Sequence, residues 1–208
     1  VVDAEGLDDV GCDLLWLPPV EAMYPYGADQ AVRVRVPGIT DVLDGAHRPG
    51  HFDGVATVVA RLFNQVQPDV AAFGRKDYQQ LEVVRYLVRD LAFPIELLAG
   101  DTVREDDGLA MSSRNQYLDA GERARAPQIH RSLLAMRDAL RGGQVPAAVE
   151  AAATAGLRAA GFEVDYAVVR RADLSDVGEV AESGDYVALV AAGLGRTRLI
   201  DNLEFELG

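Results

Sequence analysis

Apolar and polar positions in the first half of the chain predict an alternation of strands and helices. The run DVAAFG, at residues 69–74, is short and almost wholly apolar, as expected of a buried strand in a parallel sheet. Residues 77–90 predict a helix, and FPIELLAG at 93–100 predicts the next strand. The buried stripe of that helix is expected to consist of Leu81, Val84, Leu87, Val88 and Leu91. A strand, a helix and a strand with short joins predict a βαβ unit and a parallel sheet.

The residues before this unit predict two more strands, a loop and a helix. DLLWLPP at 13–19 predicts a short buried strand closed by two prolines, with Cys12 beside it as a small core residue. VRVRVP at 32–37 alternates apolar and polar positions, which predicts a half-exposed strand. Glycines and a proline predict a loop at residues 45–54, and residues 55–66 follow as a helix.

The pattern changes after Asn115, where a second unit is expected to begin. Two alanine-rich helices and then three strands are predicted at residues 120–143, 145–161, 162–170, 186–194 and 197–205. Helices followed by strands without interleaved crossovers predict a small α+β domain. The boundary is expected near residues 111–118, which gives a first domain of residues 1–112 and a second of residues 113–208.

Composition and charge narrow the class of protein. Of the 208 residues, 49% are hydrophobic, enough for one sizeable core or for one core and a small second domain. The net charge of -13 disfavours nucleic-acid binding, so any anionic ligand must be met by a local cationic pocket. Cys12 is the only cysteine, which excludes an intrachain disulfide and a cysteine-rich metal site. An acidic start and the lack of any apolar run of about 20 residues predict a cytoplasmic protein without a membrane partner.

The stretch GRKD, at residues 74–77, lies where a predicted strand ends and a helix begins. Ligands of open parallel sheets bind beyond the carboxyl ends of the strands, and a helix N-terminus offers free N–H groups to phosphate. Lys76 would add a full positive charge there. A structural alternative stays open, in which Asp77 caps the helix, Gln80 completes a capping box and Lys76 is a solvated surface residue.

The stretch DGLAMSSRNQYL, at residues 107–118, has no regular periodicity but gathers hydrogen-bond donors. Arg114 could fork onto phosphate oxygens, and the hydroxyls of Ser112 and Ser113 could donate to the same oxygens. The alternative is a helix cap between two domains, with Arg114 in a structural ion pair.

The histidines give weaker signals. His47 and His51 are four positions apart, but Pro49 and Gly50 between them disfavour the regular helix that a metal site would need. Loop-anchoring roles are expected for both, with Arg48 as a weak candidate for anion contact, and His130 is expected to have no special role. The sequence contains no G-x-S-x-G, no G-x-x-x-x-G-K-[ST] and no G-x-G-x-x-G, which disfavours serine hydrolases, P-loop NTPases and standard dinucleotide sites.

Together these stretches resemble the pantoate–β-alanine ligases, also called pantothenate synthetases. The matching segments, in the order of the family and along essentially the whole chain, are EAMYP (21–25), VPG (36–38), RPGHFDGV (48–55), LFNQVQPDVAAFGRKDYQQL (62–81), TVREDDGLAMSSRNQYL (102–118) and LIDN (199–202). The resemblance implies an α/β fold with a Rossmann-like nucleotidyltransferase domain and a small α+β C-terminal domain. It also implies a cytoplasmic homodimer that joins (R)-pantoate to β-alanine with ATP and Mg²⁺, through a pantoyl adenylate, and releases AMP and pyrophosphate.

The resemblance further implies roles for individual residues, with no protein side chain as a dedicated metal ligand. Gln80 is expected to hold pantoate, and Val103 to lie near the adenine of ATP. The other expected ATP contacts are Gly74, Arg75, Lys76, Asp77, Met111, Ser112, Ser113 and Arg114, the last four in a mobile loop. As catalytic residues, Lys76, Ser112, Ser113 and Arg114 would stabilise negative charge on the phosphoryl oxygens and the leaving group. No side chain needs to become covalent, since the work is positioning and electrostatics.

The sequence departs from the family pattern in its leading region. The family carries an H-x-G-H motif whose histidines contact ATP phosphates, and this sequence lacks it, since HRPGH at 47–51 has a different spacing. A glutamine that holds pantoate and β-alanine belongs to the same region, and Asp53 stands where the family often has a basic residue. We therefore expect a chain that lacks the first segment of the family. Two alternatives stay open: a catalytically incomplete chain that folds and dimerises, or another nucleotidyltransferase of the superfamily with a different acid substrate.

Overall fold

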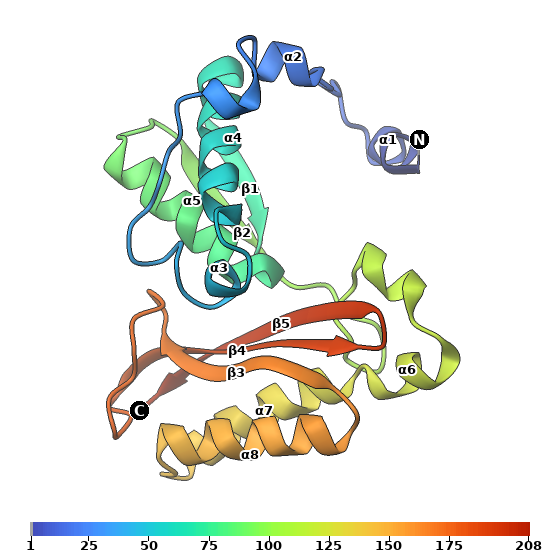
Figure 1. Cartoon of the computed structure of the whole chain (residues 1–208), viewed down its shortest axis with the longest axis vertical. Helices are drawn as coiled ribbons and strands as arrows, with labels where there is room; N and C mark the ends of the chain where they lie inside the picture. The colour runs from blue at the N-terminus through green and yellow to red at the C-terminus, as the bar shows by residue number, and fades with distance from the viewer. Residues whose placement is uncertain (1) are drawn as a thin grey trace.

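Two separate sheets organise the chain, one parallel and one antiparallel (Figure 1). The computed structural model describes residues 2–208, with side chains from Glu5 onward. Strands β1 (Val70–Gly74) and β2 (Glu96–Gly100) pair in parallel, as the βαβ pattern predicts. The α/β class, with a parallel sheet and a separate small antiparallel sheet, is confirmed.

Two helices cover one face of the parallel pair. They are α4 (His51–Val66) and α5 (Tyr78–Asp90), whose apolar stripes pack on each other and on alternate residues of both strands. The other strand face is exposed, with Val70 and Leu98 about half accessible. The expectation that β1 is wholly buried is therefore wrong within the described residues, because a parallel strand loses its exposed face only when both sides of the sheet are covered.

The antiparallel sheet is buried on both faces along its central strand. Its order is β3–β4–β5, and the bounds of these strands and of the two helices beneath them are β3 (Glu163–Arg171), β4 (Gly184–Leu194), β5 (Thr197–Leu207), α7 (Gln128–Arg141) and α8 (Pro146–Ala159). One face packs on α7 and α8 (Figure 1). The other face packs, through Val187 and Leu189, on the first part of the fold, which runs from the start of the described chain to residue 112. This double burial explains why β4 reads as a nearly continuous apolar run.

Two predicted strands are wrong. Residues 13–19 form no strand, their Leu14 and Leu17 are exposed, and Cys12 is exposed instead of buried. Residues 32–37 form no strand either, and the Val34 N–H donates to Thr57 Oγ1 at 2.8 Å instead of to a neighbouring strand. Apolar alternation specifies a face that can pack, but a strand also requires a hydrogen-bonding neighbour, which neither segment has in the described structure.

Several helix limits differ from the pattern because glycine and proline interrupt it. The predicted loop at 45–54 contains the end of α3 (Asp44–His47) and the start of α4, which are separated where Gly50 takes a φ of 78°. The single helix predicted at 120–143 is divided at Pro127 into α6 (Ala120–Arg125) and α7. The remaining short elements are α1 (Val2–Asp9), α2 (Val20–Met23), η1 (Ala28–Gln30), η2 (Arg75–Asp77) and η3 (Ser113–Tyr117).

The segment between β2 and α6 crosses from the first part to the second (Figure 1). Leu109 on this segment already packs in the core beneath the antiparallel sheet. We nevertheless propose to keep the division into residues 1–112 and 113–208, because η3, which packs against β5, begins at Ser113. Within residues 2–208, no helix has the length and apolar character required to cross a membrane.

Candidate active site

A cavity lies where the start of α5 meets strand β5, between the two parts of the fold. It holds about 510 Å³ of space that atoms do not fill, part of it open to solvent. A smaller cavity adjoins it and shares Lys76, Arg114 and Arg198 with it. The basic residues that line the larger cavity are Arg48, His51, Lys76, Arg114 and Arg198.

Only some of these cations are available to a ligand. Arg198 is occupied, because it pairs with Asp44 at 2.6 Å and with Asp165 at 2.7 Å. Arg48, Lys76 and Arg114 have no carboxylate partner among the residues with described side chains. The acidic chain therefore presents a local group of uncompensated cations at this cavity, which is what an anionic ligand requires.

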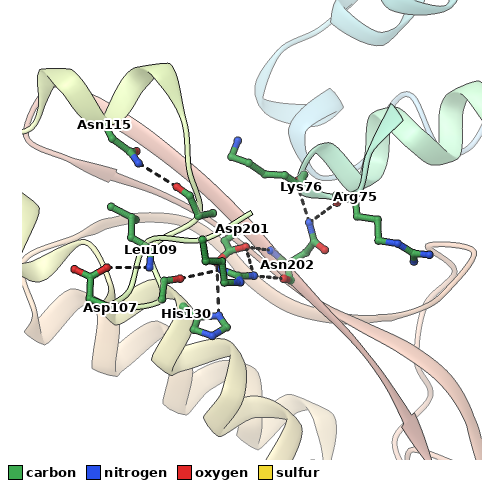
Figure 2. A network of polar contacts seen from close by, with 11 residues as sticks. Arg75, Lys76, Asp107, Leu109, Asn115, His130, Asp201 and Asn202 are labelled. Carbon is green, nitrogen blue, oxygen red and sulfur yellow. Dashed lines mark hydrogen bonds and ion pairs between the residues drawn. The ribbon is translucent and has the colours of Figure 1, made fainter. Parts of the chain in front are cut away.

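Lys76 is the only lysine of the chain and lies on the turn η2, directly after β1. Its side chain lines both cavities. The neighbouring Arg75 points the other way (Figure 2) and pairs with Glu204 at 2.5 Å and with Asp101 at 3.2 Å. Two adjacent cations thus have separate functions: Arg75 ties η2 to β5, and Lys76 faces the cavity.

The first turn of α5 places two further predicted residues at the cavity. Asp77 and Gln80 both line it. Asp77 makes no side-chain capping hydrogen bond, so the capping-box alternative is wrong. The turn η2 runs directly into α5, so the helix begins without a side-chain cap. Gly74 ends β1 beside them, with no heavy atom near the position of an added Cβ.

Gln79, which sequence reasoning missed, fixes the loop at one side of the cavity. Its side chain is 5% exposed, and its Nε2 donates to the carbonyl oxygens of Ile39 at 2.7 Å and Val42 at 2.8 Å. Its Oε1 accepts from the N–H of Asp44 at 3.0 Å. A helix turns by 100° per residue, so consecutive glutamines point in different directions. The pair of adjacent glutamines was the only signal in the sequence for a structural role of Gln79. Gln80 lines the cavity, and Gln79 holds the loop at residues 39–44.

Three hydrogen-bonded side chains, Asp44, Tyr166 and Arg198, also line the cavity. Asp44 Oδ1 accepts from Tyr166 Oη at 2.9 Å and from Arg198 Nη2 at 2.6 Å. Burial alone would raise the pKa of Asp44, but the hydrogen bond and charge of Arg198, together with Tyr166, lower it. Burial and the neighbouring Asp44 carboxylate raise the pKa of Tyr166. The tyrosine therefore stays a neutral donor, and the aspartate stays ionised.

The predicted loop at 107–118 reaches the cavities through two of its residues. Ser112 lines the smaller cavity and accepts from the Arg114 N–H at 3.2 Å, which starts η3. Arg114 lines both cavities and forms no ion pair with a described side chain, so the alternative of a structural ion pair is not met. The other predicted residues of this region, Val103, Met111 and Ser113, are exposed and lie outside both linings.

His51 is paired with a cation and is therefore neutral in this arrangement. Arg48 Nη1 lies 3.1 Å from His51 Nε2, and a guanidinium can only donate, so this ring nitrogen must accept. Burial, followed by the charge of Arg48, lowers the pKa of His51. Among the residues with described side chains, no group of three or more His, Cys, Asp and Glu is arranged to hold a metal ion.

We expect NMR titration of the ring protons to give His51 a pKa below 6.5. Arg48→Met should raise that pKa without restoring it fully, because burial is the larger cause. As the pH falls below 6.5, the unfolded chain takes up a proton at this histidine before the folded protein does, so the free energy of unfolding decreases toward the folded-state pKa. Above pH 6.5 the histidine is neutral in both states, and this loss of stability is absent. His51→Gln assigns the resonance among the three histidines. A pKa that does not move in Arg48→Met would contradict this pairing.

Comparison with known protein families gives a consistent result over nearly the whole chain. A sequence model of the family described as Pantoate-beta-alanine ligase matches residues 1–204. A pantothenate synthetase of Xylella fastidiosa (strain 9a5c) is 64% identical over 205 residues, which are 98% of this chain and 72% of the relative. A pantothenate synthetase of Xanthomonas oryzae pv. oryzae (strain MAFF 311018) is also 64% identical, over 203 residues, with the same two coverages.

Solved structures of pantothenate synthetases from other organisms share the fold. The pantothenate synthetase of Thermus thermophilus superposes with a TM-score of 0.89 at 48% identity, covering 97% of this chain and 73% of that one. A pantoate-beta-alanine ligase of Francisella tularensis, in complex with Beta-gamma ATP and β-alanine, gives a TM-score of 0.76 at 27% identity. That alignment covers 97% of this chain and 68% of the other.

Proposed function

The chain belongs to the pantoate–β-alanine ligase family, and we propose that the cavity between α5 and β5 is where it carries out the reaction of that family. The protein is an ATP-dependent ligase that condenses pantoate with β-alanine. The observation that carries the placement is the convergence of Lys76 and Arg114 on both cavities, from two segments far apart in the sequence.

The proposed chemistry has two steps and needs no covalent enzyme intermediate. A carboxylate oxygen of pantoate attacks the α-phosphorus of ATP, the bond to the bridging oxygen breaks, and pyrophosphate leaves with that electron pair. The amine of β-alanine then attacks the acyl carbon of the pantoyl adenylate, AMP leaves, and the amine loses a proton. Negative charge grows on the phosphoryl oxygens in the first step, so fixed cations around them lower its barrier.

The proposed roles are those that the family resemblance implies, and most of these residues line the cavities. Lys76 and Arg114 would contact the phosphates, the hydroxyl of Ser112 would donate beside them, and Gln80 would hold pantoate. The hydroxyl of Ser113, which lies outside both linings, is proposed to donate beside Ser112 on the resemblance alone. The remaining residues proposed along ATP are Gly74, Arg75, Asp77, Val103 and Met111. Because the Arg75 side chain is paired with Glu204, its contact with ATP would come from the backbone.

The proposal includes Mg²⁺, and one carboxylate of the cavity fits it. Asp44 and Asp201 are each paired with an arginine, whereas Asp77 has no hydrogen bond or ion pair from a described side chain. Mg²⁺ is commonly held by one or two carboxylates together with substrate phosphates and waters, so Asp77, which the sequence predicted as an ATP contact and not as a metal ligand, is the residue that would hold it. When bound, the ion would offset phosphate charge. A homodimer and a cytoplasmic location belong to the same proposal and rest on the family resemblance.

Pantoate-dependent exchange of radiolabelled pyrophosphate into ATP tests this function directly. With Mg²⁺ and without β-alanine, we expect exchange that requires pantoate, because the adenylate forms reversibly before the amine enters. Other short 2-hydroxy acids serve as the control for a different acid substrate. Exchange that a different acid supports better than pantoate would favour another nucleotidyltransferase activity. A folded protein without any exchange would contradict the proposed first step.

A further inference from the structure

The turn that carries Lys76 is held by a side chain from the other part of the fold. Asn202, on strand β5, donates from Nδ2 to the carbonyl oxygens of Arg75 and Lys76, each at 2.9 Å (Figure 2). The asparagine is 6% exposed. Both of its amide hydrogens are therefore used on two consecutive carbonyls of η2, the three-residue turn between β1 and α5.

Such a turn gains little rigidity from its own hydrogen bonds. A 3₁₀ turn has poorer hydrogen-bond geometry than an α-helix, and the carbonyl oxygens of Arg75 and Lys76 accept from Asn202 on β5. Lys76 has no ion pair with a described side chain that would fix its direction from the other end. The direction in which its side chain leaves the turn thus depends on how the two carbonyls are held.

Asn202 is itself fixed before any ligand arrives. Its backbone N–H donates to Asp201 Oδ1 at 2.8 Å, and its backbone carbonyl oxygen accepts from Arg104 Nη2 at 3.3 Å. Arg104 in turn grips both carboxylate oxygens of Asp201, at 2.7 and 3.0 Å. The sheet register places Asn202 opposite Leu189 of β4, which is buried. The backbone that carries the Asn202 side chain is therefore held in place beside η2.

We propose that Asn202 is a positioning residue for Lys76 in adenylate formation. It acts by donating to the two carbonyls of η2 and so aims the Lys76 ammonium at the cavity, without contacting a substrate itself. The proposal rests on the role given to Lys76 under the proposed function. The competing explanation is that Asn202 only joins the two parts of the fold, in which case its loss would affect stability and not the step that Lys76 assists.

A double-mutant cycle separates these two explanations. Asn202→Asp keeps the shape of the side chain but turns an acceptor toward the two carbonyls of η2. We expect it to lower kcat of pantoate-dependent pyrophosphate exchange about 100-fold, the loss typical of a catalytic group displaced by about 1 Å. In the Lys76→Ala background the same change should cost less than about threefold, because the group it positions is gone. The KM for pantoate should change little in both backgrounds.

Two further variants complete the design. Glu206→Gln changes an exposed residue on the same strand and should leave kcat unchanged. Asn202→Ala removes the donor without adding a charge and replaces Asn202→Asp if thermal unfolding shows that the aspartate variant is not folded. Equal losses in the wild-type and Lys76→Ala backgrounds, unchanged kcat in Asn202→Asp, or failure of both Asn202 variants to fold would overturn the proposal. If Lys76→Ala alone retained normal exchange, the role of Lys76 would fail and this inference with it, an outcome distinct from the others.

Discussion

Lys76→Ala is expected to lower kcat for pantoyl adenylate formation roughly 100- to 1,000-fold, the usual cost of removing one preorganised donor from the site of developing charge. Lys76 is the cation that faces both cavities from η2 without a carboxylate partner among the described side chains. The fold should be intact, because the side chain forms no buried ion pair whose loss would destabilise it. Pyrophosphate exchange gives the rate, and thermal unfolding gives the stability.

Because Lys76 is the single lysine of the chain, chemical modification offers a second test of its role. An amine-directed reagent can modify only Lys76 and the α-amino group, and ATP should protect Lys76 from it. Lys76→Arg keeps the charge but replaces a compact ammonium with a planar fork, so it should recover only part of the activity. Exchange within about tenfold of wild type in Lys76→Ala would contradict the proposed role, since one preorganised donor usually contributes more.

The elements predicted best are those whose signals are local. The apolar spacing that predicts α5 reflects one stripe, and Leu81, Val84 and Leu87 are buried, as predicted. Leu91, also assigned to that stripe, is exposed because it lies one residue beyond the helix. The segments 13–19 and 32–37 failed because a strand depends on a neighbour elsewhere in the chain, which alternation does not encode.

The same distinction between local and nonlocal signals applies to the residues of the site. GRKD and SSRN carry turn and helix-start chemistry in consecutive residues, so Lys76 and Arg114 could be named from the sequence, and the structure brings them together. The group of Asp44, Tyr166 and Arg198 could not, because its members come from α3, β3 and β5 and meet only after the sheet packs on the first part of the fold. No local pattern distinguishes those residues from surface charges.

The Arg104–Asp201 pair belongs to this nonlocal class and joins the segment before α6 to β5. The two carboxylate oxygens of Asp201 accept from the two guanidinium ends, and the Asp201 side chain is only 4% exposed. Arg104 Nη1 also donates to the carbonyl oxygen of Gly108 at 3.0 Å, which closes the short hairpin leading to Ser112. Stability and the placement of this hairpin therefore depend on the same ion pair.

Arg104→Met is expected to lower the free energy of unfolding by about 3 kcal/mol at neutral pH, because it leaves a buried carboxylate without its cation. The double variant Arg104→Met/Asp201→Leu should recover most of that loss, since a buried ion pair can often be replaced by apolar side chains at little cost. The charge of Arg104 also helps to lower the pKa of His130, so that pKa should rise in Arg104→Met. Urea unfolding followed by circular dichroism, with NMR titration of His130, checks both effects.

The exposed pair Arg89–Asp90 provides the matched control, because its side chains are 65% and 58% accessible. Arg89→Met should change the free energy of unfolding by less than about 0.5 kcal/mol, as exposed ion pairs contribute little. If Arg104→Met were as mild as this control, water would be compensating Asp201 and the pair would not hold the hairpin. If the double variant were no more stable than Arg104→Met, the loss would come from missing arginine packing and not from an unpaired charge, because removing Asp201 would then relieve nothing.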